Sequence, residues 1–81
     1  MRLVYTQRFR KRFNDALPEI QRAFDKQAQF LLADLHHPSL HAKKYDESRD
    51  IWQGRVTRDW RFYFSIEGDA YVMHTIQPHP K

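Results

Sequence analysis

The sequence predicts a two-layer α+β domain: an N-terminal strand, a helical hairpin, and then a three-stranded antiparallel meander with the helices packed on one face of the sheet. Apolar residues recur at helical spacing between residues 9 and 35, and alternate with polar residues between residues 51 and 76. The 81 residues include no cysteine, but 15% are aromatic. A core this small must therefore be built from aromatic side chains rather than held by disulfides. We expect one domain over residues 1–81.

The first half of the chain predicts a strand and two helices. Residues 2–5 (RLVY) read as a short strand, and Thr6 is a suitable N-cap for the helix that follows. Pro18 interrupts this helix but suits the first turn of a second one. We expect the second helix to end near residues 36–37, because Pro38 restricts the residue before it. The apolar positions of the two helices are Phe9, Phe13, Ala16, Leu17, Ile20, Phe24, Ala28, Leu31 and Leu35.

The second half predicts a connection and three strands. Residues 37–50 are polar and have no clear period, so we expect a connection there. Strands are expected at residues 51–57, 60–67 and 70–76, and Gly68 suits the tight turn between the last two. The final residues, QPHPK, contain two prolines and are not expected to pair as a central strand.

Alternation in these strands separates an aromatic face from a basic one. One face is predicted to carry Trp52, Gly54, Val56, Trp60, Phe62, Phe64 and Ile66. The other carries Gln53, Arg55, Thr57, Arg61, Tyr63 and Ser65. Because an unpaired buried charge is costly, we expect Arg55 and Arg61 to stand on the face away from the helices, which an antiparallel sheet can leave in solvent. His74 is expected on the packed or helix-facing side as a structural histidine with its hydrogen bonds satisfied.

The net charge of +4 and its distribution favour a polyanionic partner. Residues 1–44 carry nine Lys and Arg against four Asp and Glu, whereas residues 45–81 carry five against six. The densest patch is Arg8, Arg10, Lys11 and Arg12. It fits either the solvated face of a helix or a surface that docks on phosphates.

The segment IWQGRVTRDWRFYFSIEGDAYVMHTIQPH resembles the C-terminal half of the RelE/ParE superfamily of bacterial toxins. The matching positions are Ile51-Trp52, Arg55-Val56, Trp60-Arg61 and His79, and HPSLHAKKYD resembles the family's HP…KK connection. Members share the order strand, helix, helix and three strands, so the resemblance extends over the whole chain. These degenerate motifs indicate the superfamily better than the cellular target.

The resemblance implies a toxin that is held inactive by a separately encoded antitoxin. RelE-like members cleave messenger RNA on the ribosome without a metal or other cofactor, so the expected partners are a cognate antitoxin, the ribosome and mRNA. ParE-like members poison DNA gyrase instead, and a noncatalytic nucleic-acid-binding relative is a third possibility. We expect a cytoplasmic protein and no membrane partner, because the sequence contains neither an apolar run of about 20 residues nor a signal-peptide core.

RNA cleavage of this kind requires cations and a proton-transfer group. A ribose 2′-hydroxyl must lose a proton and attack phosphorus, and the resulting phosphorane is dianionic. Arg55 and Arg61 are expected to stabilise that charge, although an ion pair between Arg61 and Asp59 is the structural alternative. His79 is the expected proton-transfer residue, since imidazole changes charge near neutral pH. Tyr63 could stack on a base or donate a hydrogen bond.

Further basic residues are expected to contact RNA phosphates. They are Lys43, Lys44, Arg58, Lys81, Arg10 and Lys11. Gln53 departs from the resemblance, because related nucleases often carry a charged group two positions before Arg55. No metal is expected at His36, His37 and His41, since the sequence supplies no cysteine and no well-spaced carboxylates beside them.

Overall fold

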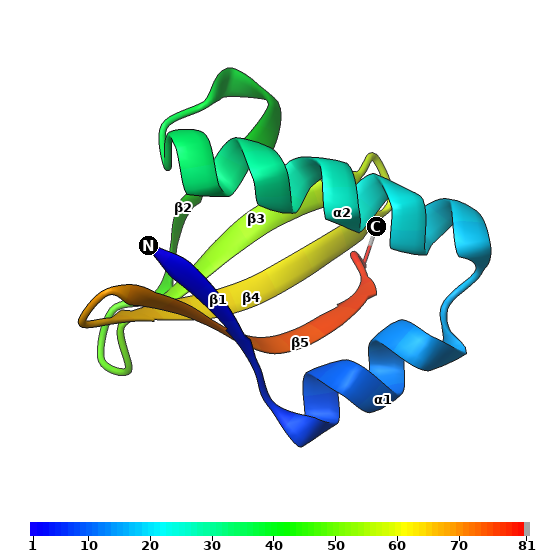
Figure 1. The fold of residues 1–81 in the computed structure, drawn as a ribbon, viewed down its shortest axis with the longest axis horizontal. Helices are drawn as coiled ribbons and strands as arrows, with labels where there is room; N and C mark the ends of the chain where they lie inside the picture. Colours follow the sequence, from blue (N-terminus) through cyan, green and yellow to red (C-terminus); the bar gives the residue numbers. More distant parts are fainter. Residues whose placement is uncertain (81) are drawn as a thin grey trace.

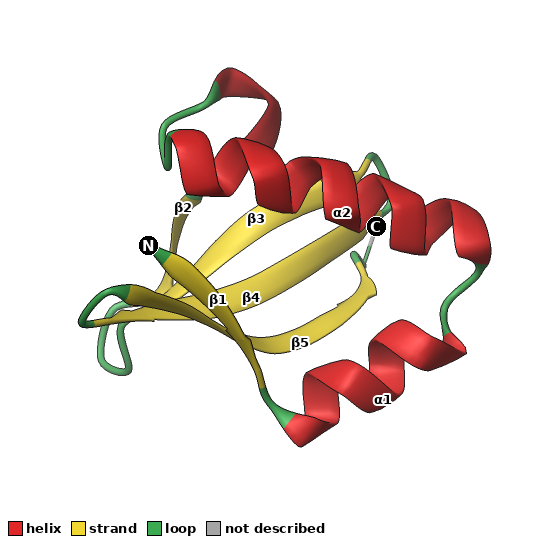
Figure 2. Cartoon of the chain, in the orientation of Figure 1, coloured by secondary structure: helices red, strands yellow, loops and turns green. Residues whose placement is uncertain are grey.

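The computed structural model describes residues 1–80 as two helices and one five-stranded sheet, so the α+β prediction is confirmed (Figures 1 and 2). The elements are β1 (Arg2–Tyr5), α1 (Gln7–Asp15), α2 (Pro18–Ala33), the 3-10 turn η1 (Pro38–Leu40), β2 (Lys43–Asp46), β3 (Ile51–Thr57), β4 (Trp60–Glu67) and β5 (Ala70–Pro78). No helix within residues 1–80 is both long and apolar enough to cross a bilayer.

The strand order in the sheet is β1-β5-β4-β3-β2. The meander β2-β3-β4-β5 is antiparallel throughout, whereas β1 pairs in parallel with β5 along residues 70–73. Between β1 and β5 the chain passes through both helices and then through β2, β3 and β4, which is ample length for the long connection that parallel strands require. Figure 1 shows α2 lying across β3 and β4, while α1 lies beside β5.

Local chemistry explains where the helices begin and end. The Thr6 hydroxyl accepts from the Phe9 N–H at 3.1 Å and so caps α1, as predicted. Pro18 opens α2. The predicted end of α2 at residues 36–37 is wrong, because Asp34 has extended backbone and its carboxylate accepts from the His36 N–H at 2.8 Å. This local turn competes with the next helical hydrogen bond.

Two sheet predictions are also wrong. Residues 43–46, expected to be part of a connection, form the edge strand β2. This segment contains Lys43 and Lys44, and lysine is typical of an edge strand. Because of these polar residues the segment shows no apolar alternation that would have predicted a strand. The last strand, expected to end at residue 76, continues through Gln77 and Pro78, which pair with Arg61 and Trp60. Pro78 is tolerated because β1 pairs with β5 only at residues 70–73, so the other side of Pro78 is a free edge.

The core lies between the helices and the aromatic face of the sheet. Phe9, Phe24, Phe62 and Phe64 are essentially inaccessible to solvent. Phe24 links the layers: its ring centroid is 5.0 Å from that of Phe9 on α1 and 5.4 Å from that of Phe62 on β4. These are favourable aromatic contacts, and they fix which face of the sheet points away from the helices.

Candidate functional site

Arg55 and Arg61 lie directly opposite each other on β3 and β4, on the face away from the helices. Arg61 is in turn opposite Gln77 of β5, so the three residues form one row across the sheet. Side chains in such cross-strand positions have Cβ atoms about 5 Å apart. Neither arginine has a carboxylate within 4.0 Å among residues 1–80. The row therefore contains two like-charged side chains, and neither has an acidic partner within residues 1–80.

Arg61 also closes the β3–β4 turn. Its Nη1 donates to three carbonyl oxygens of that turn, those of Thr57 at 2.7 Å, Arg58 at 3.1 Å and Trp60 at 2.9 Å. The ion pair with Asp59 considered from the sequence is not formed. The backbone contacts orient the guanidinium without neutralising its charge.

Arg55 is half-buried, and its backbone is held by a hydrogen bond from a side chain of α2. The buried Gln27 side chain donates from Nε2 to the Arg55 carbonyl oxygen at 2.9 Å and to the Ser39 carbonyl oxygen at 3.0 Å. The Nε of Arg55 is buried and has no hydrogen-bond partner within residues 1–80. Buried donors are normally satisfied, so this orphan N–H is an exception within the fold.

Tyr63 lies one row further along β4, at the centre of the same face. We expected this face to be open to solvent, but Tyr63 is only 7% exposed and its neighbours Gln53 and Thr75 are similarly buried. Tyr45 packs edge-on against the Tyr63 ring, with centroids 4.8 Å apart. Burial raises the pKa of Tyr63, and Tyr45 adds to this, whereas the nearby Arg61 charge lowers it.

A hollow of about 380 Å³ opens on this face, which we call the sheet-face basin. Its lining residues are Arg8, Tyr45, Arg49, Ile51, Tyr63, His74, Thr75 and Gln77. They come from α1, β2 and its following loop, β3, β4 and β5. Bulges in the β2–β3, β3–β4 and β4–β5 ladders increase the local twist, which helps to curl the sheet around this hollow.

His74 lies in the basin, so its predicted place on the helix-facing side is wrong. The β4–β5 register shifts between Tyr63, opposite Thr75, and Phe64, opposite Met73, which leaves His74 as the extra residue of a bulge. The bulge turns its side chain to the face that carries Ser65, whose Oγ is 2.8 Å from His74 Nε2. Simple alternation along β5 could not reveal this, because a bulge breaks the alternation.

His79 follows the end of β5 and is exposed. Its backbone N–H donates to the Asp59 carbonyl oxygen at 2.7 Å, which ties this tail to the turn that Arg61 closes. Its imidazole makes no hydrogen bond to the described residues. The backbone of His79 therefore lies beside the turn that Arg61 closes, but no side-chain contact within residues 1–80 orients its ring.

The predicted RNA-contacting residues are dispersed. Lys43 is exposed and opposite Gln53, whereas Lys44 is paired with Asp50 at 2.8 Å and Glu47 at 3.7 Å. The hydrogen bond to Asp50 is the main cause that raises the pKa of Lys44. Arg58 is exposed in the β3–β4 turn, and Lys81 lies outside the described residues.

The basic first helix does not present one surface. Arg8 reaches the sheet-face basin, but Arg10 lines a separate hollow of about 420 Å³ between α1 and α2. Lys11 is exposed and lies 3.5 Å from the Asp15 carboxylate. Of the dense basic patch, only Arg8 therefore belongs with Tyr63 and His74. Residues 1–80 contain no cluster of three or more His, Cys, Asp or Glu side chains suited to a metal ion.

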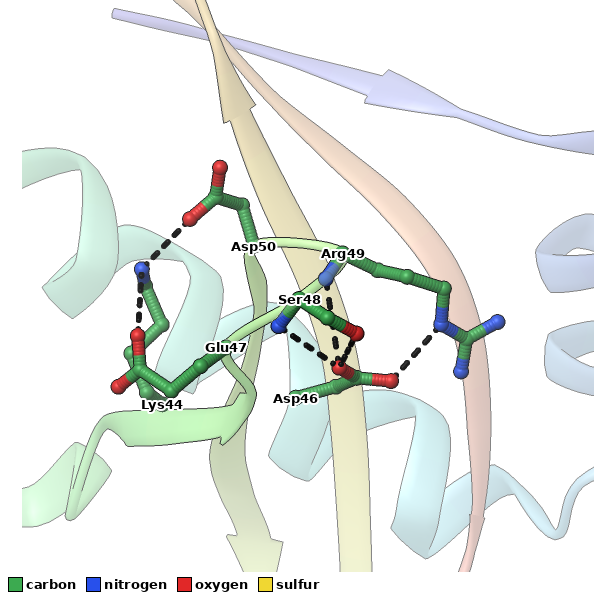
Figure 3. A network of polar contacts seen from close by, with 6 residues as sticks. All are labelled: Lys44, Asp46, Glu47, Ser48, Arg49 and Asp50. Atoms are coloured by element: carbon green, nitrogen blue, oxygen red, sulfur yellow. Dashed lines mark hydrogen bonds and ion pairs between the residues drawn. The ribbon is translucent and has the colours of Figure 1, made fainter.

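Arg49, which lines the basin, belongs to the loop between β2 and β3, and the polar contacts that hold this loop are drawn in Figure 3. Asp46 Oδ1 accepts from the N–H and hydroxyl of Ser48, while Oδ2 accepts from Arg49 Nε at 2.8 Å. The Arg49 hydrogen bond, followed by those of Ser48, lowers the pKa of Asp46 to about 2. Sequence reasoning missed Arg49 and His74 as site residues, and it named Arg8 only as part of the basic patch of the first helix. In the sequence only their residue types pointed to a functional site, because the basin is assembled from segments that are distant in the chain.

The sequence matches no protein-family model and no curated protein sequence. The structure is similar to the YoeB/ParE toxin from Agrobacterium tumefaciens, with a TM-score of 0.82 and 13% identity over 99% of this chain and 100% of that chain. It is similar to a chain of the archaeal RelE–RelB complex from Pyrococcus horikoshii OT3, with a TM-score of 0.78 and 15% identity over 95% and 92% of the two chains. It is also similar to a chain of the RelB–RelE antitoxin–toxin complex from Methanococcus jannaschii, with a TM-score of 0.75 and 12% identity over 93% and 88%. The chain therefore has the fold of the RelE and YoeB/ParE toxins, as its sequence resemblance implied.

Proposed function

We propose that this chain is the toxin of a toxin–antitoxin pair and that it cleaves messenger RNA on the ribosome without a metal ion. The observation that carries the proposal is the Arg55–Arg61 pair. Like charges directly opposite each other destabilise a sheet, so a pair without a carboxylate among residues 1–80 indicates an anionic ligand. The resemblance of the sequence to RelE-like toxins, whose fold the chain shares, supports RNA as that anion.

The proposed chemistry uses the 2′-hydroxyl of the RNA as the nucleophile. Arg55 and Arg61 hold backbone phosphate of the RNA and add preorganised positive charge to the site. Neither can act as the base, because arginine stays protonated. In the prediction made from the sequence, His79 transfers a proton, and Tyr63 contacts the base or donates to phosphate.

Purified ribosomes carrying a defined mRNA test this proposal. We expect truncated mRNA with no metal added beyond the Mg²⁺ that keeps the ribosomes assembled, and cleavage lowered at least tenfold by Arg55→Gln and by Arg61→Ala. His79→Ala tests the proton-transfer role that the sequence predicts for this residue. Arg55→Gln is the cleaner variant, since the Arg55 side chain makes no hydrogen bond within residues 1–80, whereas Arg61 also holds the turn. Arg22→Ala, an exposed change on α2, is the matched control.

Two results would change this proposal. Intact mRNA together with inhibition of gyrase-catalysed supercoiling would favour a gyrase-directed toxin. Full cleavage by folded Arg55→Gln and Arg61→Ala variants would leave the ribonuclease but remove the arginine pair from it. Melting temperatures of all variants must be measured alongside, because only folded proteins are informative.

The proposed partner is an acidic antitoxin that covers the basic sheet face. Its gene is expected next to this one, and its binding should weaken as salt is raised because the toxin carries a net charge of +4. Titration calorimetry at two salt concentrations would check this. Affinity indifferent both to salt and to Arg55→Gln and Arg61→Ala would contradict the proposed position of the antitoxin.

A further inference from the structure

A chain of two hydrogen bonds ends at His74, on the wall of the sheet-face basin. Ser65 Oγ lies 2.7 Å from Glu67 Oε2 and 2.8 Å from His74 Nε2. Ser65 is buried, Glu67 is exposed and His74 is half-buried on the basin wall. The three side chains come from two adjacent strands, so the sheet itself fixes their spacing.

The donor and acceptor inventory assigns the protons in this chain. An ionised carboxylate only accepts, and a serine hydroxyl has one proton to donate. Ser65 therefore donates to Glu67 and must accept from His74 Nε2–H. In the neutral ring the remaining lone pair is on Nδ1, and Nδ1 makes no hydrogen bond within residues 1–80. This is the arrangement of an oriented imidazole whose second nitrogen is available to a ligand.

Two guanidinium groups accompany His74 in the basin. Arg49 is anchored to Asp46 through Nε, which leaves its terminal nitrogens uncommitted among the described residues, and Arg8 reaches in from α1. Arginine at such a position suits phosphate. The charged or titratable groups that line the basin together with the imidazole are Tyr45, Tyr63, Arg49 and Arg8, and Glu67 is linked to it through Ser65.

We propose that His74, oriented by Ser65 and Glu67, is a proton-transfer residue that accepts the 2′-hydroxyl proton of an RNA bound in the basin. The inference rests on the proposed ribonuclease function. As Nδ1 takes the proton, the O2′–P bond forms and the P–O5′ bond breaks. The leaving O5′ takes a proton from water, and the imidazolium returns its proton to the hydroxide so formed. The products are a 2′,3′-cyclic phosphate and a 5′-hydroxyl.

The position of His74 separates its role from that of the arginine pair. Arg61 and Ser65 are four residues apart on β4, which corresponds to about 13 Å. A single phosphate group cannot contact both Arg61 and the part of the basin beside Ser65 and His74, but an RNA strand can reach both. Arg55 and Arg61 then hold a flanking phosphate, while Arg8 and Arg49 stand beside the scissile one. Compared with the exposed His79, His74 is the imidazole whose ring is already oriented by the protein.

The first test needs no RNA substrate. Long-range proton–nitrogen NMR correlations of the labelled full chain report the tautomer of each histidine, and we expect Nε2–H for His74 at a pH where the ring is neutral. Ser65→Ala should remove this preference. A neutral His74 protonated on Nδ1 instead would overturn the proposal.

The second test measures kcat and KM separately on mRNA-programmed ribosomes. We expect His74→Gln to lower kcat at least 100-fold with KM changed less than threefold, whereas Arg55→Gln mainly raises KM. Ser65→Ala should lower kcat about tenfold and displace the acidic limb of the pH–rate profile. His36→Gln, an exposed change, is the control that leaves both constants unaltered.

The outcomes distinguish the two proposals. A wild-type protein that leaves mRNA intact overturns the ribonuclease function and this inference with it. Cleavage by wild type together with a folded His74→Gln variant within threefold of its kcat overturns only the role of His74. Loss of kcat in His74→Gln with an unchanged pH profile in Ser65→Ala overturns the positioning role of Ser65.

Discussion

The ring of Phe62 lies directly over Gly54, its cross-strand neighbour, so closely that a Cβ on residue 54 would be 2.4 Å from Phe62 Cζ. Phe62 is completely buried, and it packs edge-on against Phe24 of α2. The absent side chain at residue 54 therefore makes room for the ring that joins the sheet to the helical layer. Arg55, the next residue along β3, projects from the opposite face of the sheet.

Gly54→Ala should destabilise the protein by about 1–3 kcal/mol, the usual cost of forcing extra volume into a packed core. Denaturant unfolding would measure it. Phe62→Leu should partly relieve the clash, so the double variant should be more stable than the sum of the single effects. Gly68→Ala, where the added Cβ meets nothing within 4 Å but φ is +60°, should show no such coupling to Phe62→Leu. Additive effects of Gly54→Ala and Phe62→Leu would contradict the contact.

Gln27→Leu should cost about 1–3 kcal/mol, because the buried amide joins three parts of the fold and its loss leaves acceptors without a donor. The amide donates to the carbonyl oxygens of Ser39 and Arg55, and its Oε1 accepts from the Ser39 hydroxyl at 2.9 Å. Hydrogen exchange should quicken around η1 and the Arg55 end of β3. Gln29→Leu, an exposed change two residues along α2, is the matched control. Equal stability of the two variants would mean that the Gln27 bonds contribute nothing net.

The Asp46–Arg49 contact should make the stability of the protein fall in acid. The pKa of Asp46 is lowered from 3.8 to about 2, so the stabilisation is fully present above pH 3.8 and is lost as the pH falls through about 2. Asp46→Asn should therefore be less stable than wild type at pH 5, with the difference shrinking toward pH 2. In Arg49→Gln, NMR titration of the Asp46 carboxyl should give a pKa closer to 3.8. An unmoved pKa there would assign the shift to Ser48 instead.

Lys43 and Lys44 should differ in their effect on binding to single-stranded RNA. Lys44 is already paired with Asp50 and Glu47, and its Nζ lies 5.4 Å from the centroid of the Trp52 ring. Lys43 has no carboxylate within 4.0 Å among residues 1–80 and is exposed beside the basin face. Lys43→Gln should reduce the slope of log K against log salt by about 0.7, the value of one phosphate contact on a single strand.

Lys44→Gln should change that slope much less, because its positive charge is already compensated within the protein. Fluorescence anisotropy with a labelled RNA oligomer at several salt concentrations would measure both variants. If Lys44→Gln reduced the slope as much as Lys43→Gln, the intramolecular pairing would have to give way when RNA binds.

Much of the scaffold follows from local patterns in the chain. The strands at Ile51–Thr57 and Trp60–Glu67 were predicted with the bounds that the structure has, because alternating apolar residues and turn residues act over a few positions. Thr6 and Pro18 likewise placed the starts of both helices. The same alternation put Arg55 and Arg61 on the face away from the aromatic core, and their register places them opposite each other.

The sequence by itself thus determined the order of the elements and the separation of the aromatic face from the basic one. Only the tertiary structure decided that residues 43–46 pair as an edge strand, that β5 bulges at His74, and that Arg8 and Arg49 meet on the wall of one hollow. Periodicity records which side of its own element a residue occupies. A bulge, an edge pairing or a shared cavity depends on partners far away in the chain, so each arises only when the sheet is assembled.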